Sequence, residues 1–205
     1  MRVALPDSTL GAARRSLRSE LNARRRTVSA GERAAAARRA TLNADRVLHL
    51  RAGQRIAAYA ALPAELDSAP LIALAQARGC CVLLPRIDRR RQSRGMRFIE
   101  LQGPLRENRL GIAEPAGSAA LGARWLDVVF LPLVGFDRWG LRLGTGGGFY
   151  DRAFAFRHLR RTWHKPLLVG FGYAFQQVER LAAAPHDVPL DAVVTDEGFI
   201  RCTTG

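Results

Sequence analysis

Residues 126–134 read LDVVFLPLV, the strongest strand pattern in the chain. A short apolar run rich in valine and leucine is typical of a strand buried on both faces, as in a parallel sheet. Residues 140–152, GLRLGTGGGFYDR, follow shortly after it. Ligands bind beyond the carboxyl ends of the strands in open α/β sheets. The strand and the glycine-rich segment therefore predict an α/β fold with a binding loop at the end of this strand.

The glycine-rich segment has the composition of a phosphate site. Five of its first nine residues are glycine, and consecutive glycines can turn backbone N–H groups inward around an anion. Arg142 adds a delocalised charge that suits phosphate oxygens, and Asp151 supplies a carboxylate of the kind that holds Mg²⁺. Neither G-x-x-x-x-G-K-[ST] nor G-x-G-x-x-G is present, because Phe149 stands in place of the third glycine of the latter. The alternative interpretation is a glycine-rich surface turn.

Further strands and helices extend the pattern in both directions. Ser29 and Glu32 form a capping box that starts a helix, and Pro85 is expected to halt a strand. The strand–helix–strand unit over residues 55–84 implies parallel strands joined by a right-handed crossover. We expect strands at 55–61, 80–84, 96–101 (an edge strand), 166–172 and 191–195, helices at 12–26, 29–50, 68–79 and 150–160, and an irregular segment at 108–115.

These elements predict an α/β protein with a mostly parallel central sheet flanked by helices, a Rossmann-like three-layer arrangement. Its N-terminal part, residues 10–50, is helical and basic. A length of 205 residues fits one domain, 1–205. The stretch 86–94 contains five arginines and is expected to be a flexible basic loop.

The cysteine and histidine content excludes two classes of small protein. Three cysteines and four histidines without ligand spacing indicate neither a disulfide scaffold nor a structural zinc site. No apolar run approaches the roughly 18 residues of a membrane span, and no signal-peptide core is present. We therefore expect a cytoplasmic protein without a membrane partner, and a monomer.

The net charge of +14 points to an anionic partner. Arg14, Arg18 and Arg25 share one face of the first predicted helix; the alternative is a solvated basic face. A nucleic-acid-binding module would need aromatic side chains beside its basic surface, and residues 1–55 contain no Phe, Tyr or Trp. This absence counts against nucleic acid. A polyanionic small ligand, such as a nucleotide or a polyglutamylated cofactor, would also suit the charge, which by itself does not decide the partner.

The chain resembles the 5-formyltetrahydrofolate cyclo-ligase family, also called methenyltetrahydrofolate synthetases. The matching segments come in the family's order: 14–18, 59–67, 84–86, 111–115, 127–152, 176–178, 186–187 and 193–195. The resemblance implies the ATP-dependent closure of 5-formyltetrahydrofolate to 5,10-methenyltetrahydrofolate, with release of ADP and phosphate. In this family the formyl oxygen is thought to take the γ-phosphoryl group, after which N10 attacks and phosphate leaves.

The same resemblance implies the site. Arg142 and Tyr150 would be the catalytic residues, Asp151 and Asp187 would hold Mg²⁺, and Ala60, Glu65 and Tyr150 would contact the folate, with or without a polyglutamate tail. The implied ATP site comprises Arg14, Arg18, Arg142, Leu143, Gly144, Thr145, Gly146, Gly147, Gly148, Phe149 and Tyr150. From the residues alone, Asp187 could instead cap a turn, and Glu65 could be an exposed loop acid or a charge at a helix N-terminus. Tyr59 is expected in the core.

Three positions depart from the family pattern. Arg14 stands where lysine is usual, Phe149 replaces the first of two frequent tyrosines, and Ala60 is smaller than the usual apolar residue. Two further alternatives remain: a regulatory relative that binds ATP or folate without catalysis, and a related ATP-using enzyme of the same fold. The first is opposed by the retained Arg142, Tyr150, Asp151 and Asp187. The folate enzyme is favoured over the second by Glu65 and the intact GFYDR sequence at 148–152.

Overall fold

A computed structural model describes residues 7–87, 95–103, 105–107, 113–115, 117, 119–159 and 165–203. Within these residues the largest sheet has eight strands in the order β12-β11-β10-β7-β1-β2-β3-β6. Its strands are β1 (Arg55–Ala57), β2 (Cys81–Ile87), β3 (Met96–Glu100), β6 (Ala120–Leu121), β7 (Val128–Pro132), β10 (Leu167–Gly172), β11 (Ala192–Thr195) and β12 (Phe199–Arg201). Two small pairs accompany it: β4 (Leu105–Glu107) with β5 (Ala113–Pro115), and β8 (Gly135–Phe136) with β9 (Arg142–Leu143).

The sheet is mostly parallel, as predicted. Strands β11, β10, β7, β1 and β2 run parallel to one another, whereas β12, β3 and β6 pair antiparallel at the two sides. In chain order the parallel strands are arranged 2-1-3-4-5, one of the common orders of doubly wound sheets. The chain reverses direction across the sheet between β1 and β7. Such a switch point leaves a crevice beyond the strand ends, where ligands bind.

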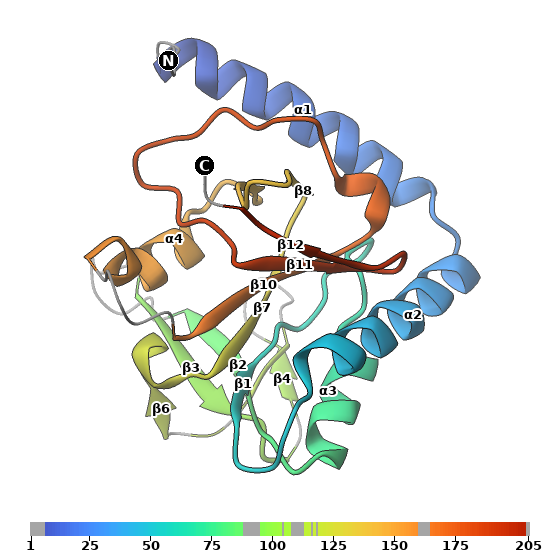
Figure 1. Ribbon diagram of the computed structural model, residues 1–205, viewed down its shortest axis with the longest axis vertical. Coiled ribbons are helices and arrows are strands. Elements are labelled where there is room, and N and C mark those ends of the chain that lie inside the picture. Colours follow the sequence, from blue (N-terminus) through green and yellow to red (C-terminus); the bar gives the residue numbers. More distant parts are fainter. Residues whose placement is uncertain are drawn as a thin grey trace.

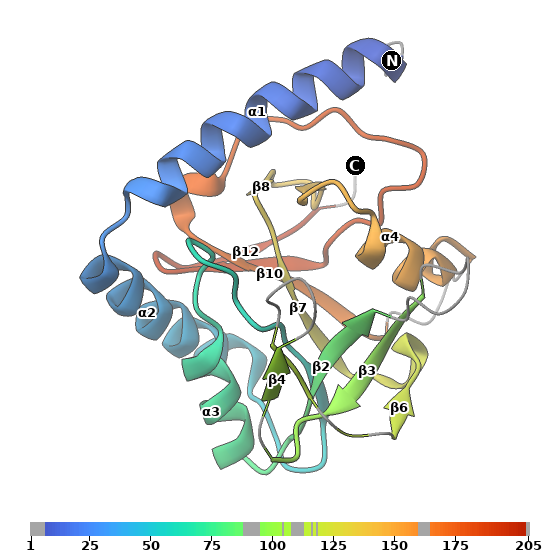
Figure 2. The ribbon, with the colours of Figure 1, turned by 180° about the vertical axis from the view of Figure 1, so that it is seen from behind.

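Helices cover both faces of the sheet (Figures 1 and 2). On one face lie α2 (Ala30–Leu48) and α3 (Ala69–Ala77), and on the other lie α4 (Phe149–Phe154) and the 3₁₀ turns η1 (Ala123–Trp125) and η2 (Ala155–Leu159). Successive strand residues point to opposite faces, so Phe130 enters the core under α2 while Leu131 enters the core under α4. This confirms the three-layer α/β prediction.

The second helix begins where the sequence predicted. The hydroxyl oxygen of Ser29 accepts the N–H of Glu32, and the Glu32 carboxylate accepts the N–H of Ser29 at 2.9 Å. The buried face of α2 consists largely of alanines, including Ala36, Ala40 and Ala44. Small side chains allow the helix to lie close against the sheet.

Pro85 does not halt its strand. β2 continues to Ile87, with Pro85 opposite Phe98 of β3. On the other side β1 pairs only with residues 81–83, so at Pro85 the strand has a neighbour on one side only. A strand that is locally an edge tolerates the missing N–H of proline.

Other boundaries also differ from the expectations. β1 ends at Ala57 instead of residue 61, and β3 is not an edge because β6 pairs with it. The helix expected at 150–160 is divided into α4 and η2, and residue 160 lies outside the described residues. Residues 86 and 87 of the expected loop belong to β2, and 88–94 lie outside the described residues. β12 was not expected, and 113–115 of the irregular segment form β5.

The first helix, α1 (Asp7–Thr27), crosses over the end of the molecule near β8 (Figure 1). Leu21 is buried in a small cluster with Val134, Leu143 and Leu181, and a Cβ on Gly135 would lie 2.7 Å from the Leu21 side chain. None of the helices in the described parts of the chain combines the length and apolar character that crossing a membrane requires.

A buried carboxylate supports the hairpin that precedes the glycine-rich segment. Asp137 has no exposed surface. Its Oδ1 accepts the N–H groups of Trp139 and Leu141 at 3.0 Å each, and its Oδ2 accepts that of Leu181 at 3.0 Å. The β8–β9 turn is thereby fixed to the segment after η3 (Ala174–Gln176).

Replacement of Asp137 by alanine should lower the free energy of unfolding by about 3 kcal/mol, because three backbone N–H groups lose their acceptor. Urea denaturation measures the change. Asp67→Ala is the control, since the exposed Asp67 accepts a single bond from Ala69 N–H and should matter by at most about 1 kcal/mol. Equal losses in the two variants would contradict this role for Asp137.

Candidate active site

A cavity of about 410 Å³ opens beyond the carboxyl ends of β1 and β7, at the switch point of the sheet. Its walls come from α1, the loop after β1, the end of β7, the glycine-rich segment, α4 and residues 186–187. Every site residue named from the sequence lines it: Arg14, Arg18, Ala60, Glu65, Arg142, Leu143, Gly144, Thr145, Gly146, Gly147, Gly148, Phe149, Tyr150, Asp151 and Asp187. Segments far apart in sequence thus meet in one cavity, and the individual roles stay predictions.

The glycine-rich segment needs glycine for its backbone shape. Gly146 has φ +103° and Gly148 has φ +62°, a region that other residues adopt only with strain. A Cβ on Gly148 would also lie 2.8 Å from Nη1 of Arg152. Residues 145–147 are exposed at the cavity, and Nε of Arg18 donates a 2.8 Å hydrogen bond to the Gly144 carbonyl. Helix α1 is thereby bound to this loop.

Arg142 is a buried guanidinium with fixed partners. It is 8% exposed. Its Nη2 lies 2.7 Å from Oδ1 of Asp151, and its Nη1 donates to the Val188 carbonyl at 2.8 Å. The same Oδ1 accepts the N–H of Val188 at 3.3 Å. A buried charge requires such partners, so Arg142 joins β9, α4 and the 187–188 segment at the cavity wall.

A second ion pair joins α1 to the far wall. Nη1 of Arg14 lies 3.2 Å from Oδ1 of Asp187, and Nη2 contacts Oδ2 of the same carboxylate. Nε of Arg14 also donates to the Ala182 carbonyl at 3.1 Å. The Asp187 carboxylate accepts the N–H of Ala184 at 2.7 Å. Asp187 therefore caps a turn, as the alternative interpretation held, and lines the cavity as well.

The arginines at this end of the cavity are crowded. Burial, together with the neighbouring Arg14 and Arg15, lowers the pKa of Arg18 from its ordinary value. Three guanidinium groups, on Arg14, Arg18 and Arg142, face two aspartates here. An anionic ligand would relieve the repulsion and balance the charge. The alternative of a solvated basic face is wrong for Arg14 and Arg18, which line the cavity.

The other end of the cavity holds a buried acid, Glu65, because its partner Arg25 lies eleven residues, roughly 16 Å, along α1 from Arg14. Glu65 is 8% exposed. Its Oε2 accepts the N–H of Leu62 at 3.0 Å, and its Oε1 lies 3.6 Å from Nη2 of Arg25. Burial raises the pKa of Glu65, while the Leu62 N–H and Arg25 oppose the rise. The alternative of an exposed loop acid is therefore wrong.

Two tyrosines lie beside Glu65. Burial, and then the charge of Glu65, raises the pKa of Tyr150, so its phenol keeps its proton and remains a hydrogen-bond donor near neutral pH. Tyr59 is 3% exposed, as the core prediction requires, and also lines the cavity. Its hydroxyl donates to the Leu66 carbonyl at 2.7 Å, which braces the loop that carries Glu65.

The carboxylates of Asp151 and Asp187 could serve as ligands for some metal ions and not for others. The described residues contain no cluster of three or more His, Cys, Asp or Glu side chains that could hold a metal. Two carboxylates suit Mg²⁺, which keeps water and phosphate oxygens as its other ligands. They do not suit a structural zinc site, which needs a full set of protein ligands. The residues therefore fit a magnesium ion that arrives with a polyphosphate.

Several residues of the cavity wall, and Arg25 behind it, were not recognised from the sequence as parts of the site. Arg25 was placed on the helix face of Arg14 and Arg18 but received no role, although that spacing is a usable signal. The apolar wall of the cavity could not be predicted from the sequence, because strand ends and loops come together to form it only when the chain folds. It comprises Leu62, Pro85, Ile87, Met96, Pro132, Leu133 and Val134.

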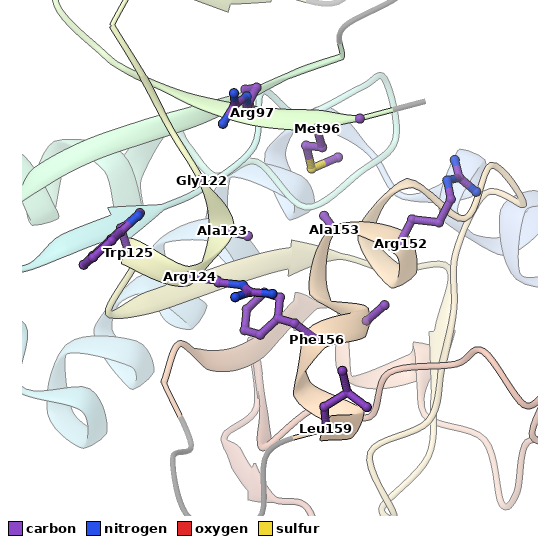
Figure 3. A pocket seen from close by; sticks show the side chains of 12 residues that line it. Met96, Arg97, Gly122, Ala123, Arg124, Trp125, Arg152, Ala153, Phe156 and Leu159 are labelled. Atoms are coloured by element: carbon purple, nitrogen blue, oxygen red, sulfur yellow. The ribbon is translucent and has the colours of Figure 1, made fainter. Parts of the chain in front are cut away.

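A second cavity, of about 690 Å³, lies between β3, η1 and the α4–η2 segment (Figure 3). Arg97, Arg124 and Arg152 stand around it, and the guanidinium of Arg124 lies 5.2 Å from the ring centre of Phe156. None of the described residues that line it is acidic, and of the glycine-rich segment its last residue, Arg152, lines it while the glycines do not. Its described lining therefore lacks carboxylates such as Asp151 and Asp187, the metal ligands predicted in the smaller cavity.

Fold and site define a doubly wound α/β protein with a cavity lined by arginine and glycine at the switch point of its sheet. The sequence profile of the 5-formyltetrahydrofolate cyclo-ligase family matches residues 11–196. The chain belongs to this family of ligases, as the resemblance predicted.

Individual relatives agree with this assignment. The chain is 38% identical to the 5-formyltetrahydrofolate cyclo-ligase of Escherichia coli K12 over 146 residues, which cover 68% of this chain and 76% of the relative. It is 32% identical to the Haemophilus influenzae protein of the same name over 182 residues, 86% of this chain and 94% of the relative. The solved structure of the 5,10-methenyltetrahydrofolate synthetase of Aquifex aeolicus superposes with a TM-score of 0.77 at 27% identity, covering 94% of each chain.

Arg18→Met should weaken the binding of ATP roughly tenfold, because a hydrogen bond to a charged group contributes about 1.5 kcal/mol or more. Isothermal titration with ATP and Mg²⁺ measures the affinity. Arg15→Met is the matched control: it removes the same charge from an exposed position of the same helix. Equal weakening in the two variants would indicate general electrostatic attraction instead of a defined contact.

Proposed function

We propose that this protein catalyses the ATP-dependent cyclisation of 5-formyltetrahydrofolate to 5,10-methenyltetrahydrofolate, with release of ADP and phosphate. One observation carries the proposal. A single cavity joins a glycine-rich loop and three arginines at one end to the buried carboxylate of Glu65 at the other. The names of the relatives and the family agree with such a substrate.

The two ends of the cavity suit the two substrates. Arg14, Arg18 and the loop at 142–150 present the positive charge that a triphosphate requires. Glu65 can accept N–H groups of a pterin ring, and Ala60 lines the wall beside it. Tyr150 belongs to the loop and lies near both Glu65 and Arg142: burial raises the pKa of its phenol most, the charge of Glu65 raises it further, and the charge of Arg142 lowers it.

When bound, ATP supplies the phosphoryl group that turns the formyl oxygen into a good leaving group. The chain contributes position and charge to this chemistry. Arg142 is held between Asp151 and the Val188 carbonyl, so its charge is fixed in place before the reaction and can stabilise negative charge on the transferred group. No general base is required, and His186 lies exposed at the rim.

Asp151 and Asp187 would hold Mg²⁺, which would neutralise phosphate charge. Both carboxylates are now paired with arginines, Asp151 with Arg142 and Asp187 with Arg14. A nucleotide that binds together with a cation can replace both ion pairs. Each arginine would then contact phosphate oxygens, and each aspartate would contact the cation. The donor set therefore accommodates metal and nucleotide together.

The arginines of α1 that the sequence offered to nucleic acid are used otherwise, because Arg14 and Arg18 line the cavity and Arg25 is buried. A regulatory relative that binds ATP or folate would differ from the proposed enzyme in one respect: it would not convert the substrate. The monomeric state and the cytoplasmic location stay predictions.

Purified protein mixed with 5-formyltetrahydrofolate and Mg²⁺ should form the methenyl product, seen by its near-ultraviolet absorbance, only when ATP is added. Asp151→Asn should lower the rate roughly 100-fold, because Arg142 loses its charged partner and the metal a ligand. The matched control is Asp45→Asn, which breaks an arginine pair with Arg78 on the α2 side of the molecule. Folate binding without turnover in the unaltered protein would support the regulatory alternative instead.

A further inference from the structure

Arg25 is the most buried arginine of the described chain, with 4% of its surface exposed. It lies on α1, seven residues beyond Arg18. Its Nη1 donates to the side-chain oxygen of Asn22 at 3.0 Å, and its Nε donates to the Ala64 carbonyl at 3.0 Å. Nη2 lies 3.6 Å from Oε1 of Glu65. Arg25 therefore holds both the backbone and the side chain of the turn that carries the acid.

Glu65 is enclosed by groups from several elements. Arg25 approaches from α1, Tyr59 from the end of β1 and Tyr150 from α4, and the Tyr173 hydroxyl beyond β10 donates to the Glu65 carbonyl at 3.4 Å. The three tyrosines are neutral near pH 7, since burial is the largest cause raising the pKa of each one. Among the described groups around Glu65, Arg25 is thus the positive charge that stabilises its ionised form.

We propose that Arg25 is a positioning residue of the reaction: it holds the Glu65 carboxylate ionised and turned toward the cavity, ready to accept the N–H donors of the pterin. This inference rests on the proposed function, which assigns Glu65 to the folate. Arg25 itself acts through Glu65 and does not line the cavity.

The balance around Glu65 explains why such a residue is needed. Burial alone favours the neutral carboxyl, and the pKa of Glu65 is raised even with Arg25 in place. A carboxylate offers two acceptor oxygens, whereas a protonated carboxyl carries a donor on one of them. Without Arg25 the pKa of Glu65 would rise further, so the acid would stay protonated up to a higher pH and would present a donor to the N–H groups of the pterin.

The pH dependence of the reaction follows from the direction in which loss of Arg25 moves the pKa of Glu65. Binding of the folate needs ionised Glu65, so kcat/KM for 5-formyltetrahydrofolate should fall as pH drops through the pKa of Glu65. Loss of Arg25 raises that pKa further. The acid limb of the profile should therefore move to higher pH, and the defect should shrink as pH rises.

The experiment measures kcat/KM for 5-formyltetrahydrofolate and KM for ATP across pH in Arg25→Met and Arg25→Lys. Arg25→Met should lose roughly tenfold in kcat/KM on the acid limb of the profile, where loss of the neighbouring charge leaves less of Glu65 ionised, and should recover at alkaline pH. Its KM for ATP should stay within about twofold, a small change in binding free energy. Arg25→Lys keeps the charge and should restore most of the loss. Arg26→Met, the same change at the exposed neighbour, should leave both profiles unchanged.

A double-variant cycle separates positioning from simple structural support. Glu65→Gln should remove the acid limb. If Arg25 acts through Glu65, adding Arg25→Met to Glu65→Gln should cause little further loss in kcat/KM, a strongly non-additive result. A further tenfold loss in the double variant, or an acid limb in Arg25→Met that does not move, would overturn the proposal.

Two measurements keep the outcome clear. If Arg25→Met does not fold, Arg25→Gln keeps side-chain N–H donors without the charge and should still move the limb; an unmoved limb in folded Arg25→Gln would also refute the idea. The unaltered protein is assayed in the same series. Absence of turnover there would count against the proposed function, whereas normal turnover with unshifted variants would count against Arg25 alone.

Discussion

The organisation of the cavity depends on one buried ion pair, between Arg142 and Asp151. It joins the strand before the glycine-rich loop to the helix after it, and the bond from Arg142 to the Val188 carbonyl adds a third segment. A guanidinium buried to this extent cannot be left without partners, since an unpaired charge in a protein interior is strongly unfavourable. The loop therefore has both of its ends fixed, while the glycines between them supply the local backbone shape.

Helix α1 provides the other half of the site although it belongs to neither layer of helices on the sheet. The buried side chain of Leu21 packs α1 against the β8–β9 hairpin. Three arginines on the helix, which lie one to three turns apart, contact different walls of the cavity. Arg14 and Arg18 meet Asp187 and the Gly144 carbonyl, and Arg25 meets the Glu65 turn. One helix face thus links the two ends of the cavity, and a displacement of α1 would disturb both.

Local signals in the sequence were sufficient for the features that depend on neighbours in the chain. The capping box at Ser29, the apolar strand over 126–134 and the glycine-rich loop all have local causes. Features that depend on residues far away in the sequence could not be predicted. The tolerance of Pro85 depends on where β1 ends, and the 3₁₀ turn that replaces the last part of the predicted helix contains Arg157, which pairs with Asp191. Likewise, the helical spacing of Arg25 was visible, but its partner 40 residues later was not.

The two arginine–aspartate pairs of the cavity also have a consequence for the thermodynamics of ligand binding. Because Arg14 and Arg142 are already immobilised by Asp187 and Asp151, a ligand that takes over their charge need not freeze long, freely rotating side chains. Ordering such a side chain otherwise opposes association by about 0.5–1.5 kcal/mol. The enthalpy gained from the new contacts with the ligand is partly offset, because the arginine–aspartate bonds within the protein are broken. Recognition at this end of the cavity should therefore be governed by shape already present in the free protein, with a modest net heat of association.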